Sequence, residues 1–138
     1  MKNDRNYTDV FSWIAMAGLL FWFAYTRGWI FANFPSVDAN TAMHLIETDK
    51  NVTILDVRTI GEYRAGHLSN AILIPLNELE TDIHKLQKSK NKKILVYCQT
   101  GNRSISASRI LEQHGFHPIN VKGGILALKS AGAEIIRQ

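Results

Sequence analysis

The feature that most restricts this chain of 138 residues is an uncharged apolar run near its N-terminus. Residues 10–26 read VFSWIAMAGLLFWFAYT, without one Asp, Glu, Lys or Arg. As a helix, the run would be about 25 Å long, slightly less than the hydrocarbon thickness of a bilayer. Arg27 follows at its edge, where a long basic side chain can reach the headgroups and extend the usable span through Phe31. We therefore predict a tail at residues 1–9 and a transmembrane helix at residues 10–32.

Three other interpretations of this run are less favoured. A helix buried in a soluble core would need more chain around it than the remaining residues provide. A helix lying in the membrane plane would need a strongly polar face, which this run lacks. A cleaved signal peptide would need small residues at the cleavage site, and the stretch Ile30, Phe31, Ala32 offers a bulky residue where a small one is required. The interpretation that we retain is an uncleaved, single-pass anchor.

The basic residues around the run bear on its orientation. Lys2 and Arg5 precede it, and Arg27 is the only basic residue shortly after it. Because basic residues favour the cytoplasmic side, this difference of one charge predicts an N-terminus inside the cell and the following domain outside. For a bacterial protein, that means a single pass through the inner membrane with the domain in the periplasm.

The composition of the whole chain excludes several classes of protein. With 46% hydrophobic and 20% charged residues, the chain is expected to fold rather than to be disordered. Its 16 basic residues exceed the 12 acidic ones by four, an excess too small and too dispersed to indicate a nucleic-acid partner. Cys98 is the only cysteine, so an internal disulfide framework and a thiolate-rich zinc site are both excluded.

After a linker at residues 33–36, short strand-like runs alternate with helix-like segments. Apolar runs rich in β-branched residues predict strands at Val52–Val57, Ala71–Ile74 and Ile94–Tyr97, and a short edge-like strand at Pro118–Val121. Helical spacing predicts a first helix from Ala39, capped by Asp38 or Ser36. Further helices are expected at Thr59–Ala65, Leu76–Leu86, Ser104–His114 and from Ile125. The basic stretch Lys85–Lys93 is expected to be a solvated loop. This alternation predicts an α/β domain at residues 37–138, with a mainly parallel central sheet of about five strands and helices on both faces.

The segment Ile94–Ser108 carries the residues best suited to chemistry. A buried strand is followed by six loop residues, Cys98 to Arg103, and then by a helix. In a parallel sheet such a loop is where ligands bind, and the amides and positive dipole end of the following helix point back at it. Cys98 should therefore be favoured as a thiolate. Gly101 lets the backbone curl, and Arg103 either holds an anionic substrate or braces the loop through a carboxylate.

From about Ser36 to Ala131 the sequence resembles a single rhodanese domain, the family of thiosulfate and related sulfurtransferases. The resemblance rests on landmarks in the family's order: Asp56-Val57-Arg58, Glu62-Tyr63, Gly66-His67-Leu68, Ala71 to Pro75, Val96-Tyr97-Cys98, Gly101-Asn102-Arg103-Ser104, Ala107, Leu111 and Gly123-Gly124. The chain departs from the family's usual pattern in its last helix, which has Ile125 and Leu128 but no tryptophan. Since aliphatic side chains can fill the same volume, this departure bears on the shape of the pocket and on the acceptor rather than on the fold.

The resemblance implies covalent sulfur transfer. Cys98 would attack the outer sulfur of a small anionic donor such as thiosulfate and pass it, as a persulfide, to a thiol or protein acceptor. Substrate binding would fall to the loop residues Gln99, Thr100, Gly101, Asn102 and Arg103. Supporting roles, by ion pairing, hydrogen bonding and packing, would fall to Asp56, Arg58, Glu62, His67 and Ser104. No metal or organic cofactor is implied.

Two alternatives stand beside this enzyme. Cysteine phosphatases and arsenate reductases of related design have one more residue between cysteine and arginine, whereas four residues separate Cys98 from Arg103 here. The tighter loop suits one sulfur atom better than a tetrahedral oxyanion. The second alternative is a non-catalytic rhodanese-like module that docks or senses at the membrane, and it would not need Cys98, Gly101 and Arg103 in register. We therefore expect a rhodanese-type thiosulfate sulfurtransferase.

Overall fold

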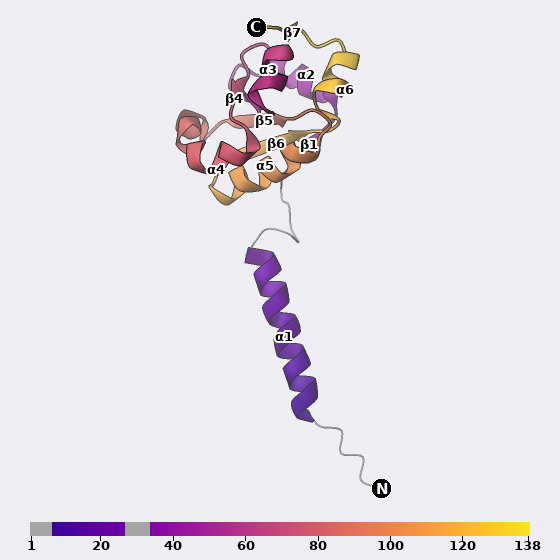
Figure 1. Cartoon of the computed structure of the whole chain (residues 1–138), viewed down its shortest axis with the longest axis vertical. Coiled ribbons are helices and arrows are strands. Elements are labelled where there is room, and N and C mark those ends of the chain that lie inside the picture. Colours follow the sequence, from indigo (N-terminus) through magenta and orange to yellow (C-terminus); the bar gives the residue numbers. More distant parts are fainter. Residues whose placement is uncertain (1–6, 27–33) are drawn as a thin grey trace. The chain divides into compact units, whose positions relative to one another are not determined.

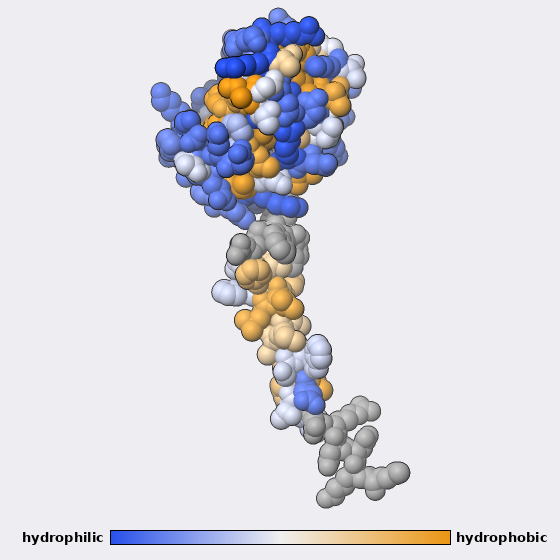
Figure 2. Space-filling view, in the orientation of Figure 1, coloured by the Kyte–Doolittle hydropathy of each residue, from blue (hydrophilic) through white to orange (hydrophobic). Residues whose placement is uncertain are grey.

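The computed structural model describes residues 7–26 and 34–138, which belong to two units divided between Ala32 and Asn33. In the first unit, α1 (Tyr7–Thr26) has no buried residue. At 20 residues it is about 30 Å long, so it is long and apolar enough to cross a bilayer, although a signal sequence meets the same criteria. Figure 2 shows that apolar side chains dominate much of its surface, whereas hydrophilic ones are abundant on the visible face of the second unit.

The helix α1 differs in extent from the predicted span. It begins at Tyr7, so residues 7–9 of the predicted tail are helical. Asp9 lies in its first turn, where the helix dipole favours a negative charge. Residues 27–32 of the predicted span lie outside the described residues, as do the basic residues on which the orientation argument depends. The orientation therefore stays a prediction.

The second unit is built on a five-stranded sheet in which every neighbouring pair is parallel (Figure 1). The strand order is β1-β6-β5-β2-β4. The bounds are β1 Ser36–Val37, β2 Val52–Asp56, β4 Ile72–Leu73, β5 Lys93–Tyr97 and β6 His117–Val121. Valine and isoleucine are frequent in β2, β5 and β6, as suits a sheet buried on both faces. The predicted mainly parallel sheet of about five strands is confirmed.

Helices cover both faces of this sheet, as the alternation of segments predicted (Figure 1). On one face pack α2 (Ala39–Thr48) and α6 (Gly124–Ser130), and on the other α4 (Leu79–Asp82) and α5 (Asn102–Gln113). The side chains of β5 alternate between the two core clusters, with Tyr97 in the first and Val96 and Cys98 in the second. The period of two along a strand therefore places the sulfur of Cys98 on the side of α5.

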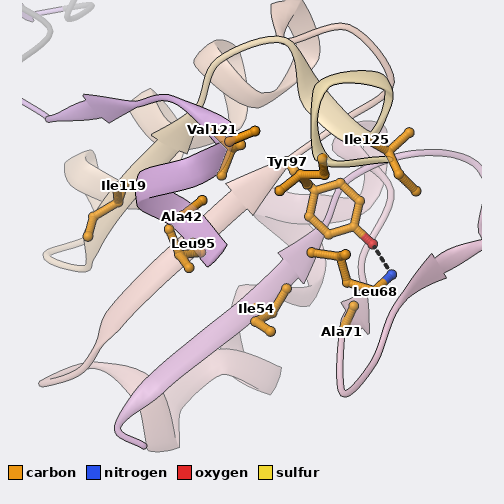
Figure 3. Close-up of a cluster of buried hydrophobic side chains, with 11 residues drawn as sticks. Ala42, Ile54, Leu68, Ala71, Leu95, Tyr97, Ile119, Val121 and Ile125 are labelled. Carbon is orange, nitrogen blue, oxygen red and sulfur yellow. Dashed lines mark hydrogen bonds between the residues drawn. The ribbon is translucent and has the colours of Figure 1, made fainter. Parts of the chain in front are cut away.

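Tyr97 fills the first core cluster at the carboxyl end of the sheet. Its ring is fully buried in a cluster with Leu68, Ala71 and Ile125, and its hydroxyl accepts a hydrogen bond from the Leu68 amide at 3.1 Å (Figure 3). Burial raises the pKa of Tyr97 far above its ordinary value, so the phenol stays neutral. Leu68 belongs to a second, antiparallel pair of strands, β3 (His67–Leu68) and β7 (Ile135–Ile136), which the sequence pattern does not predict.

The predicted edge position of the strand at Pro118–Val121 is wrong, because β6 is an interior strand. Ser36, which the sequence pattern assigned to the linker, lies opposite Asn120 in the parallel pair of β1 and β6. The Asn120 amide donates to the carbonyl of Pro35 at 2.9 Å, and the Asn120 side chain donates to Ser36 Oγ at 3.2 Å. Hydrogen bonds between residues far apart in the sequence thus add a strand that no local pattern marks.

The segment between β4 and β5 also differs from its prediction. The predicted helix at Leu76–Leu86 and loop at Lys85–Lys93 are replaced by a 3-10 turn η1 (Leu76–Glu78), the short α4 and a 3-10 segment η2 (Ile83–Ser89). Glu78 and Asp82, where these pieces join, have ψ angles of −5° and 10°, which interrupt a regular α-helix at both junctions.

Candidate active site

Cys98 lies directly after β5, at the base of the loop that leads into α5. Its Sγ accepts a hydrogen bond from the Gly101 amide at 3.0 Å and lies 3.5 Å from Ser104 Oγ. Gly101 has a φ of +108°, and a Cβ at this position would lie 3.1 Å from the amide nitrogen of Gly123. Glycine is therefore favoured at position 101 both by the backbone conformation and by the close approach of Gly123.

The first turn of α5 is part of this loop. The helix begins at Asn102, two residues before the predicted start at Ser104, and Gly101 is its N-cap without a side-chain cap. Ser104 is buried in the first turn, and its hydroxyl donates to the carbonyl of Gly101 at 3.1 Å. The earlier start brings the unpaired amides of the helix N-terminus to the sulfur.

These donors determine the ionisation of Cys98. Burial raises the pKa of the thiol, since a charged sulfur is less well solvated away from water. The hydrogen-bond contact between the sulfur and the Ser104 hydroxyl, together with hydrogen bonds from the amides of Ser104, Gly101 and Thr100, acts in the opposite direction and outweighs burial. The pKa of Cys98 therefore lies below its ordinary value, as a nucleophilic thiolate requires.

The double glycine before α6 holds the other side of the loop. Gly124 has a φ of +59°, and a Cβ at this position would collide with the carbonyl oxygen of Cys98. The next amide, that of Ile125, donates to the same carbonyl at 2.8 Å. The sequence marked Gly123-Gly124 as a landmark of the family resemblance, and the close approach of α6 to Cys98 explains why glycine is required at position 124.

Arg103 forms a bidentate ion pair with Glu62 of α3 (Ile60–Ala65). Its two terminal nitrogens lie 2.7 and 2.8 Å from the two carboxylate oxygens. Glu62 also completes a capping box with Thr59 at the start of α3. The hydrogen bonds from Arg103 lower the pKa of Glu62 to about 2. Of the two roles predicted for Arg103, this geometry matches the bracing role, and its contact with substrate stays a prediction.

Asp56 and Arg58 form a second ion pair, which is buried. Arg58 Nη2 lies 2.7 Å from Asp56 Oδ2, and the side chains are 3% and 0% exposed. Arg58 also donates to the carbonyl of Gly66 at 2.6 Å and to Oε1 of Gln99 at 3.1 Å. Arg58 thus connects the buried pair to the Cys98 loop through the side chain of Gln99, the second residue of that loop.

The remaining predicted residues are divided between the loop and the core. Thr100 and Asn102 are exposed. His67 is buried, its Nδ1 lies 2.8 Å from the carbonyl of Tyr63, and its ring stacks on that of Tyr63 with centroids 3.6 Å apart. These contacts match the structural role predicted for His67. Within residues 7–26 and 34–138, no group of three His, Cys, Asp or Glu side chains is placed to hold a metal ion.

A hollow of about 280 Å³ adjoins the loop at Gln99. Its lining residues come from the segment after β2, from α3 and the residue that follows it, from the loop and from α6: Arg58, Glu62, Ala65, Gly66, Gln99 and Lys129. Ala65 and Lys129 are the two members that the sequence did not mark as candidate residues, and of these only Lys129 is charged. Its position five residues after Gly124 in a predicted helix gave no sign that it would face the loop, because that requires the packing of α6 against Cys98.

Residues 38–131 match the family model of the rhodanese-like domain. The chain is 33% identical over 95 residues to YrkF of Bacillus subtilis, a proposed sulfur carrier protein, covering 68% of this chain and 50% of YrkF. It is 34% identical over 83 residues to the tRNA uridine(34) hydroxylase of Cronobacter sakazakii, covering 56% of this chain and 24% of that enzyme. The chain thus spans half or less of the length of these curated relatives.

A solved structure resembles the second unit throughout. The rhodanese-related protein of Thermoplasma volcanium has a TM-score of 0.69 and 32% identity to this chain, covering 76% of this chain and 100% of that one. The order of the strands, the position of the cysteine loop and the match to the family model all indicate the same fold. This chain belongs to the rhodanese-like domain family.

Proposed function

We propose that this chain is a membrane-anchored sulfurtransferase that moves a sulfane sulfur from thiosulfate or a persulfide donor to a thiophilic acceptor, with Cys98 as the nucleophile. The observation that carries the proposal is the position of Sγ, 3.0 Å from the Gly101 amide in a loop that lowers the pKa of the thiol. A thiolate stabilised in this way suits nucleophilic sulfur chemistry. The proposed sulfur-carrier role of the Bacillus subtilis relative supports the same chemistry.

The proposed reaction has two displacements. In the first, the Cys98 thiolate attacks the outer sulfur of thiosulfate, a bond forms between Sγ and that sulfur, and the S–S bond of thiosulfate breaks as sulfite leaves with the electron pair. The persulfide carries one negative charge, as the thiolate did, so the loop amides would stabilise it in turn. In the second, an acceptor such as cyanide takes the outer sulfur as thiocyanate and restores the thiolate. Covalent catalysis of this kind predicts ping-pong kinetics.

The burial of Cys98 favours transfer of a single atom. The residue is 1% exposed, and only Gln99, Thr100, Gly101 and Asn102 separate it from Arg103. Thiosulfate presents one outer sulfur without substituents, whereas a phosphoryl group surrounds its reacting atom with oxygens. Limited access to the thiol therefore supports sulfur transfer over phosphate chemistry.

The test is a sulfur-loading experiment with the full chain in a non-ionic detergent. After incubation with thiosulfate, the intact mass should rise by one sulfur atom, and added cyanide should release thiocyanate and restore the original mass. Cys98→Ser should abolish both changes. Ser106→Ala, at an exposed serine of α5, is the matched control and should behave as the parent. An unchanged rate of thiocyanate formation in Cys98→Ser would refute the mechanism.

We also propose that residues 10–32 anchor the domain at residues 37–138 to the membrane. The length and apolar surface of α1 support this. Membranes from producing cells, washed with alkaline carbonate, should retain the chain, and its intact mass should include the N-terminal segment. A chain released by the wash, or one shortened near residue 32, would contradict the anchor and favour a cleaved signal sequence. The predicted periplasmic side is tested by protease added to intact spheroplasts, which should digest the domain.

A further inference from the structure

The charged groups that line the hollow beside the Cys98 loop are not equally available. Arg58 is paired with the buried carboxylate of Asp56 at 2.7 Å, and Glu62 is paired with Arg103 at 2.7 Å. Each of these pairs is neutral as a unit. Lys129 is exposed, and no carboxylate among the described residues 34–138 lies within ion-pair distance of it. The net charge around the hollow is therefore positive, and it comes from Lys129.

The position of Lys129 relative to the loop is fixed by backbone contacts. Lys129 lies in α6, whose first amides are bound to the loop: Ile125 donates to the carbonyl of Cys98 at 2.8 Å, and Leu126 donates to that of Gln99 at 3.4 Å. Gly124 approaches the same peptide so closely that no side chain fits there. A lysine on such a short helix is held near the loop while its side chain stays free to move.

We propose that Lys129 supplies the positive charge that draws and orients the anionic sulfur donor at the Cys98 loop, a role that rests on the proposed sulfur transfer. The loop itself holds one charged residue, Arg103, and Glu62 already occupies both of its terminal nitrogens. A donor with two negative charges, such as thiosulfate, must approach a thiolate of the same sign. An unpaired cation at the rim lowers that repulsion and raises the rate of productive encounter.

Ping-pong kinetics can distinguish attraction of the donor by Lys129 from a merely structural role of Lys129 in α6. The value of kcat/KM for the donor depends only on the first displacement, and the value for the acceptor depends only on the second. Lys129 should mainly affect the step in which a dianion enters, and it should have a smaller effect on an acceptor such as dithiothreitol, which is mostly protonated at neutral pH and reacts as a thiolate with a single negative charge. Damage to the loop would lower both values.

The experiment compares variants of the full chain in a non-ionic detergent at low ionic strength. We expect kcat/KM for thiosulfate to fall about fivefold in Lys129→Ala and further in Lys129→Glu, and to be largely kept in Lys129→Arg. The difference from the parent should shrink as salt is added, because the charge is exposed and screened. The value for dithiothreitol should stay within about twofold of the parent. Lys88→Ala makes the same change in net charge at an exposed site on η2 and should match the parent.

Two results would overturn the inference while leaving the proposed function intact. One is a Lys129→Ala variant that matches Lys88→Ala in kcat/KM for thiosulfate at every salt concentration. The other is an equal loss for thiosulfate and dithiothreitol, which would assign Lys129 to the support of α6. A parent chain that gains no sulfur by intact mass from thiosulfate or from a persulfide donor such as glutathione persulfide would overturn the proposed function itself, together with this inference.

Discussion

Two arginine–carboxylate pairs hold the segments around the Cys98 loop, and they differ mainly in burial. Both have a shortest nitrogen-to-oxygen distance of 2.7 Å. The side chains of Arg58 and Asp56 are 3% and 0% exposed, whereas those of Arg103 and Glu62 are 35% and 29% exposed. The same chemistry therefore occurs once in the core and once at the surface of a single site.

The difference in burial decides what each pair contributes. Two charges in the core lose their hydration, and removing one partner leaves the other unpaired in a medium of low polarity. Arg58 and Asp56 should therefore act as a unit that is costly to break. Arg103 and Glu62 are partly solvated, so water and salt compensate much of their attraction. Their pair should position α3 against α5 with only a modest effect on overall stability.

The largest effect is expected for Asp56→Ala, which leaves Arg58 charged and buried without its partner. The free energy of unfolding should fall by about 3–5 kcal/mol. It can be measured by urea titration of the full chain in a non-ionic detergent, followed by far-ultraviolet circular dichroism. Tryptophan fluorescence is unsuitable, because Trp13, Trp22 and Trp29 all lie before the domain.

Two variants sharpen this test. Asp82→Ala removes a carboxylate from the exposed pair with Lys85 and should cost at most about 1 kcal/mol. The double variant Asp56→Asn/Arg58→Met removes both buried charges and should recover much of the lost stability. If Asp56→Ala and Asp82→Ala lost equal stability, burial would not distinguish the Asp56–Arg58 pair from the Asp82–Lys85 pair.

The same two pairs show how far the sequence could predict the site. Asp56 and Arg58 are two residues apart, so a local motif brings them together, and their ion pair could be expected from the sequence. Arg103 and Glu62 lie 41 positions apart, and the choice between holding substrate and bracing could not be made until α3 was placed beside α5. Lys129 was not predicted as a site residue for the same reason, since its approach to Gln99 depends on the packing of α6.

The fold shows the same division between local and distant information. The strands β2 and β5 are continuous apolar runs, and the loop from Cys98 is contiguous, so all three were predictable from short windows. The strands β1, β3, β4 and β7 have two residues each, too few to show a period. Three of them were missed, and β4 was predicted because it lies within the apolar run Ala71–Ile74. The helix predicted to begin at Ser104 begins instead at Asn102, with Gly101 as its N-cap.

The smallest effect is expected for the surface pair of Arg103 and Glu62, and its contribution to stability can be separated from others by lowering the pH. Arg103 lowers the pKa of Glu62 to about 2 in the folded chain, against 4.5 for an ordinary glutamate. A carboxyl group whose folded pKa is depressed contributes stability that is fully present above the unfolded pKa and is lost as the pH falls through the folded pKa. The contribution should therefore disappear between about pH 4.5 and pH 2, and because both partners are partly solvated it should be only about 1 kcal/mol.

Glu62→Gln removes the charge at all pH values, so it separates this contribution from every other acid-sensitive group. At pH 7 the variant should be about 1 kcal/mol less stable than the parent, and the two stability curves should converge towards pH 2. Glu80→Gln, at an exposed glutamate of α4, should follow the parent across the whole range. A Glu62→Gln curve that stayed parallel to the parent's down to pH 2 would mean that the amide disturbs the capping box with Thr59, and that the ion pair contributes nothing measurable to stability.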